Sequence, residues 1–114
     1  MAFVLKQSDT YVWPVTFDIP VDGGRHEKQT FDVQFKRMPQ KWIRDIAKKI
    51  DADEVFDVDV AREVVLGWSG ITDDAGKEVP FSQKALDQVL DVPTLASAMV
   101  LAYFNSVAGV KAKN

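Results

Sequence analysis

The fold is decided by residues 11–21, which read YVWPVTFDIPV. Apolar side chains occupy every second position from Tyr11 to Val21, and prolines and polar residues separate most of them. A period of two places these apolar side chains on one face of a β-strand. Because proline cannot donate a hydrogen bond to a neighbouring strand, Pro14 and Pro20 predict that this strand lies at the edge of a sheet.

A second strand is predicted to return beside the first. Residues 22–25 read DGGR and predict a tight turn, since glycine tolerates positive φ. Phe31, Val33 and Phe35 then alternate with polar residues. The chain therefore begins with an antiparallel β-hairpin over residues 10–37 that has one aromatic, apolar face. An isolated hairpin is marginally stable, so this face needs a cover.

The predicted cover is an amphipathic helix that begins near Pro39, a residue that suits the first turn of a helix. Its apolar residues recur at steps of three and four along one side, and charged residues occupy the other side. The apolar side consists of Trp42, Ile43, Ile46, Ala47 and Ile50.

The middle of the chain is predicted to continue as helix and turn. Residues 51–57 are acidic and turn-like, and a helix is expected from about Asp59 to Trp68. The many valines leave a strand open as the alternative for this segment. Residues 73–76 read DDAG and predict a second turn.

Two further helices are expected at the C-terminal end. Ser82 is placed to cap a short helix. Pro93 is expected in the first turn of a last helix that ends near Val107. The predicted fold class is thus α+β, an N-terminal antiparallel β-hairpin packed on a bundle of about four α-helices. One domain is expected for residues 1–114, with a helical part at 39–108 and a flexible tail at 109–114.

Composition limits the function. The chain has 114 residues, 46% of them hydrophobic, and a net charge of −3, which gives no general attraction to nucleic acid or anionic membranes. It has no cysteine, so disulfides and thiolate metal sites are excluded. It shows neither a signal-peptide pattern nor a long apolar run, so an intracellular, soluble protein is expected.

No set of residues assembles into a catalytic, cofactor or metal site. His26 is the single histidine and has no partner ligand. The acids at 73–78 lack the alternating spacing of a calcium loop. The acids at 51–59 favour a solvated loop and helix start, and the basic residues at 41–49 favour the solvent face of a helix. A non-enzymatic protein is therefore expected.

The last helix is apolar almost all round. Helical spacing predicts a core face of Ala96, Met99, Val100, Tyr103 and Val107. Leu101 falls on the opposite side and Phe104 at the margin, so Leu101, Phe104 and the adjacent Tyr103 are the candidate partner-binding residues. The alternative, that the hairpin and the other helices enclose this helix completely, is equally compatible with the pattern.

The connector between the middle of the chain and the last helices carries a recognisable order of apolar and turn residues. It reads VVLGW at 64–68 and GI at 70–71, followed by the Asp-Gly turn and by VPFS at 79–82. A short helix, a break near Pro93 and a last helix ending in Tyr103 and Phe104 follow. Over residues 57–107 this order resembles the tail assembly chaperones of long-tailed bacteriophages. The expected structural anchors are Trp13, Trp42, Trp68 and Phe81.

The resemblance implies a role in phage tail morphogenesis. Such chaperones bind the tape measure protein, keep it soluble and help recruit tail tube subunits. They act in the host cytoplasm, are absent from the mature virion, and are often made in a short and a frameshifted long form, of which this chain would match the short one. The alternative is another non-enzymatic viral structural or head–tail joining protein, or a generic interaction domain that forms homo-oligomers. Nucleic-acid and membrane partners are not expected.

Overall fold

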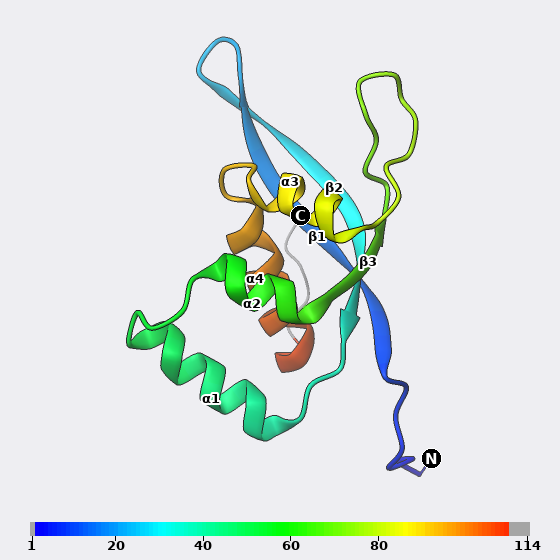
Figure 1. Cartoon of the computed structure of the whole chain (residues 1–114), viewed down its shortest axis with the longest axis vertical. Coiled ribbons are helices and arrows are strands. Elements are labelled where there is room, and N and C mark those ends of the chain that lie inside the picture. Colours follow the sequence, from blue (N-terminus) through cyan, green and yellow to red (C-terminus); the bar gives the residue numbers. More distant parts are fainter. Residues whose placement is uncertain (1, 110–114) are drawn as a thin grey trace.

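The computed structural model describes residues 2–109 (Figure 1). The elements follow one another as β1 (Thr10–Val21), β2 (Arg25–Lys36), α1 (Gln40–Asp51), α2 (Asp57–Val64), β3 (Val65–Ser69), α3 (Gln83–Leu90) and α4 (Leu95–Ala108). This arrangement confirms the α+β class. Gly109, with φ of 74°, ends α4, and the rest of the predicted flexible tail lies outside the described residues.

The predicted hairpin forms with the expected face. Tyr11 pairs with Phe35 and Val15 with Phe31 in an antiparallel register. The strand order β1-β2-β3 confirms that β1 lies at an edge of the sheet. Val15, Val33 and Phe35 are fully buried on the inner face. The turn uses positive φ at two successive glycines, a conformation that favours glycine over other residues.

The predicted helix from Asp59 to Trp68 is wrong beyond Val64. Residues 65–69 form β3, which pairs antiparallel with β2 and makes the sheet three-stranded. The β-branched residues at the junction suit a strand, and Gly67 permits close approach of Gln34. A Cβ atom at position 67 would lie 3.1 Å from the Gln34 Oε1 atom. The strand alternative therefore holds for this segment, and Trp68 sits on β3 rather than on a helix.

The cover of the hairpin is α4, not the helix that follows the hairpin directly. α4 packs on β1 and α2, and Figure 1 shows α1 at the periphery of the molecule. α4 covers the hairpin because it buries more side chains than α1 does. Ile46 is the one buried residue of α1 in the described structure, whereas α4 has no charged residue and buries a whole face. That face consists of Leu95, Ala96, Met99, Val100 and Tyr103.

The connector between β3 and α3 is ordered by local hydrogen bonds. The Asp73 carboxylate accepts hydrogen bonds from the amides of Ala75 and Lys77, each at 2.9 Å, which confirms the predicted turn. The Trp68 indole donates to the Val79 carbonyl at 2.8 Å. Trp68 also packs edge-on against Phe81, with ring centroids 4.9 Å apart. The connector is therefore scaffold that fixes α3 relative to the sheet.

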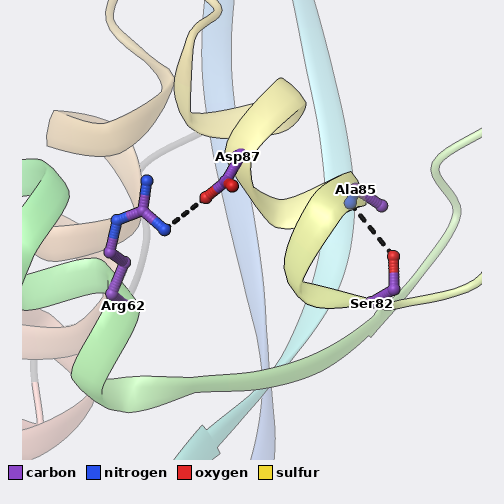
Figure 2. Close-up of polar contacts among 4 residues, drawn as sticks. All are labelled: Arg62, Ser82, Ala85 and Asp87. Atoms are coloured by element: carbon purple, nitrogen blue, oxygen red, sulfur yellow. Dashed lines mark hydrogen bonds and ion pairs between the residues drawn. The ribbon is translucent and has the colours of Figure 1, made fainter.

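Figure 2 shows how α3 is held at its surface. The Ser82 hydroxyl accepts from the Ala85 amide at 3.0 Å, which confirms the predicted cap, and Arg62 of α2 forms an ion pair with Asp87. The prediction for Pro93 is wrong, because α4 begins only at Leu95. Thr94 precedes it with φ of 70°, so the chain turns sharply at this residue before the helix begins.

Candidate partner-binding surface

The outward side of α4 is the clearest candidate surface. The helix has 14 residues and none of them is charged. Leu101 is 62% exposed, and Phe104 is half-buried beside it. Surface helices normally carry charged residues on the solvent side. An exposed leucine on an uncharged helix is therefore a feature that fits contact with another protein.

A groove runs along one flank of Leu101. It has a volume of about 580 Å³ and lies between the first turns of α4 and the hairpin. Its lining combines apolar and polar side chains: Phe17, Asp18, His26, Thr94, Ser97, Ala98 and Leu101. We call this the α4 groove. It gives the exposed leucine a shallow, open groove beside it that a partner side chain can contact.

Tyr103 does not belong to the surface around Leu101, so its assignment to the same partner-binding surface as Leu101 and Phe104 needs correction. The side chain is fully buried and packs edge-on against Phe35 and Trp42, with centroids 5.2 and 6.2 Å away. Burial raises the pKa of the Tyr103 phenol to about 12, helped by the neighbouring Tyr11 and opposed by a close polar contact with the Met38 backbone and by the charge of Arg37. Val107 was predicted on the core face of the last helix, and this prediction is wrong because the side chain is 43% exposed.

The four residues expected as structural anchors all lie against the core. Trp13, Trp42, Trp68 and Phe81 are half-buried and pack on the enclosed residues. The Trp42 indole donates to the Glu63 carboxylate at 2.9 Å, which links α1 to α2. These residues hold elements together, and none of them lies on the α4 groove.

A second groove at the other end of α4 was missed by the sequence reasoning. It has a volume of about 560 Å³. It lies between the start of β1, the segment that follows β2, and the end of α4. We call it the basal groove. Its lining residues are Tyr11, Val12, Trp13, Arg37, Met38, Gln40, Ile43, Tyr103, Ser106 and Val107. No local sequence pattern signals this groove, because its lining comes from separate stretches of the chain.

The ionisable residues do not form a metal site in the described part of the chain. Residues 2–109 contain no group of three or more His, Asp or Glu side chains that could hold a metal ion. His26 is exposed and lines the α4 groove. Among the acids at 51–59, Asp59 accepts a hydrogen bond from the Phe56 amide at 3.1 Å at the start of α2. This is the helix-start role expected for these acids.

None of the described helices is by itself long and apolar enough to cross a membrane. α3 and α4 taken together meet the criterion by length and composition alone, with a bend of 103° between them. Both helices also contribute buried residues to the core described above.

Comparison with known proteins points to one family. No curated protein and no solved structure matches this chain. The model of the YdaY prophage protein family matches residues 27–103, which run from β2 through most of α4. This match spans more than half of the chain and includes most of β2, all of β3, the connector and the part of α4 that carries Leu101. The chain therefore belongs to the YdaY prophage protein family and is of phage origin.

Proposed function

We propose that this protein is a tail assembly chaperone that binds the tape measure protein of its phage and keeps it soluble. The observation that carries the proposal is the exposed Leu101 on the uncharged helix α4, beside the α4 groove. Phage origin and the resemblance of residues 57–107 to tail assembly chaperones support it.

The proposed partner exposes apolar surface before it assembles. A long helical protein that has not yet assembled presents apolar stripes that aggregate in water. A helix-in-groove contact shields such a stripe reversibly. α4 offers Leu101 and the half-buried Phe104 for this contact, and no charge on the helix has to be desolvated.

The proposal includes a non-enzymatic role in the host cytoplasm, recruitment of tail tube subunits, and absence from the mature virion. It needs no catalytic group, because holding a partner in solution requires only a surface of the right shape and polarity. A second candidate, a structural or head–tail joining component, predicts instead that the protein persists in purified particles.

The test is co-expression of the tape measure protein with Leu101→Glu. A charge at this exposed position should leave the fold intact and reduce the soluble tape measure protein several-fold, because the carboxylate must be desolvated on binding. Phe56→Glu is the matched control, since Phe56 is 77% exposed at the start of α2 and away from the groove.

Solubility is measured by fractionation and immunoblotting, and folding by circular dichroism. If Leu101→Glu and Phe56→Glu support equal amounts of soluble tape measure protein, Leu101 is not part of the binding site. Phe104→Ser, which also removes apolar area from the same surface, then decides whether a neighbouring part of α4 is used. Equal solubility with all three folded variants would overturn the proposal.

A further inference from the structure

We propose that the basal groove binds an extended segment of a protein partner that presents a large apolar side chain beside a carboxylate. The inference rests on the groove itself and does not require the proposed chaperone function. The groove lies at the C-terminal end of α4 and shares no lining residue with the α4 groove.

The apolar part of the groove fits a large side chain. Trp13, Met38, Ile43 and Val107 contribute apolar walls, and the volume of about 560 Å³ is in the range of small-ligand sites. Val107 is 43% exposed at its rim. These apolar side chains would lose contact with water when a leucine, methionine or phenylalanine enters.

The charge of the groove selects a partner with a carboxylate. Arg37 is the one charged residue in its lining, and no acidic side chain lies with it. The Arg37 guanidinium lies 4.8 Å from the centre of the Tyr11 ring and donates through Nε to the Ser8 carbonyl at 2.7 Å. It forms no ion pair within the described residues. A carboxylate in the groove would therefore meet an uncompensated positive charge.

The Tyr103 hydroxyl supplies a second donor at the floor of the groove. It is buried and forms no hydrogen bond of ordinary geometry with the described residues, although the Met38 backbone lies near enough to lower its pKa. A buried hydroxyl without a partner is costly, and an arriving acceptor would relieve that cost. At the rim, the Tyr11 and Ser106 hydroxyls already pair with each other at 2.7 Å. The floor hydroxyl is thus a donor that a ligand meets only when the side chains above it move aside.

The edge of the sheet favours an extended ligand. Backbone groups alternate in direction along an antiparallel strand. The Asp9 carbonyl accepts from the Arg37 amide at 2.8 Å and so points toward β2, which directs the amide and carbonyl of Val12 to the free edge. Pro14 ends the run of available donors two residues later. A short extended segment can pair here next to the groove.

The chain's own N-terminal segment is a poorer occupant. Phe3, Val4 and Leu5 are 77%, 67% and 84% exposed, so a second copy could offer them to the groove. Lys6 follows directly, however, and this segment has no acid before Asp9. Its charge therefore matches that of Arg37 in sign instead of complementing it.

The experiment uses the full chain labelled with ¹⁵N and two peptide pools. The peptides are acetylated, amidated octamers with a central Leu-Glu or Phe-Glu pair, and the matched pool has Gln in place of Glu. The Glu pool should shift the signals of the Trp13 indole and the Gln40 amide and bind about tenfold tighter than the Gln pool.

Variants identify the groups responsible. Arg37→Gln should abolish the preference for Glu, and Tyr103→Phe should weaken binding of the Glu pool several-fold while keeping the aromatic packing. Arg44→Gln is the matched control, because Arg44 is exposed on α1 and does not line the groove. Circular dichroism of each variant verifies the fold.

Equal binding of the two pools, or no shift at Trp13 and Gln40, would overturn the proposal. So would concentration-dependent shifts of the free protein at these residues that disappear in a Phe3→Ser, Leu5→Ser variant. In that case the occupant is the N-terminal segment of a second copy.

Discussion

α1 and α4 are the two longest helices of the described chain, and they differ in how they meet the rest of the molecule. α1 has alternating apolar and charged sides, yet it lies at the periphery with Ile46 as its enclosed residue. α4 has no such alternation and packs between the sheet and α2. The helix with the clearer amphipathic pattern is thus the one that contributes less to the core.

The difference shows what a charge pattern conveys. Charged residues on one side of a helix tell which side meets water, but not how much the other side buries. The complete absence of charge in α4 indicates a helix that can be enclosed from several directions. It also leaves Leu101 and Val107 as exposed apolar residues, so core and candidate interface lie on the same helix.

The largest expected effect comes from truncating a buried side chain of α4. Met99 is fully buried, and Met99→Ala should lower the free energy of unfolding by about 2–5 kcal/mol because it leaves a cavity. Ile50→Ala is the matched change in α1, where the side chain is half-buried, and should cost about 1 kcal/mol. Urea denaturation followed by circular dichroism measures both. Equal losses would break the comparison between the two helices.

Much of the fold could be predicted because its signals are local. The hairpin, the Asp73 turn and the Ser82 cap each depend on a few neighbouring residues, and all three form as expected. The third strand was missed because β3 depends on β2, 29 or more positions earlier, for its hydrogen bonds. The cover of the hairpin was misassigned for the same reason, since no local pattern states which helix returns to the sheet.

The residues of the candidate site, too, were predicted only where the signal is local. Helical spacing placed Leu101 outside the core correctly. Tyr103 is one residue from Phe104 but points into the core, where it meets Phe35 and Trp42. The basal groove escaped prediction because it is built from three separate stretches of chain that meet only in the folded protein. Its floor, the unpartnered hydroxyl of Tyr103, is visible only once burial is known.

A pH titration sharpens the assignment of Tyr103 to the core of α4. Its pKa rises from 10.0 to about 12 in the folded protein, so the unfolded chain loses the phenolic proton first. The associated stability is fully present below pH 10 and is lost as the pH rises through 12. The free energy of unfolding should therefore fall more steeply over this window in the parent than in Tyr103→Phe. Parallel profiles in urea denaturation would contradict the burial of this hydroxyl.

A smaller effect is expected where α1 is attached to the body. Trp42→Phe removes the indole hydrogen bond to Glu63 but keeps an aromatic ring near Tyr103. We expect a loss of about 1 kcal/mol, together with faster amide hydrogen exchange in α1 and unchanged exchange in α4. Glu63→Gln, which keeps an acceptor for the indole, should show a weaker effect. Faster exchange in α4 as well would mean that α1 supports the core after all.

The smallest expected effect on stability is that of removing a surface ion pair, a contact that the uncharged helix α4 cannot make. Arg62 of α2 pairs with Asp87 of α3, and the two side chains are 43% and 55% exposed (Figure 2). Water and salt screen such a pair, so Arg62→Ala should cost between 0 and about 1 kcal/mol. The loss should shrink further when urea denaturation is repeated in about 1 M salt, where screening is nearly complete. A salt-independent loss as large as that of Met99→Ala would show that this contact, and not burial along α4, holds the helices together.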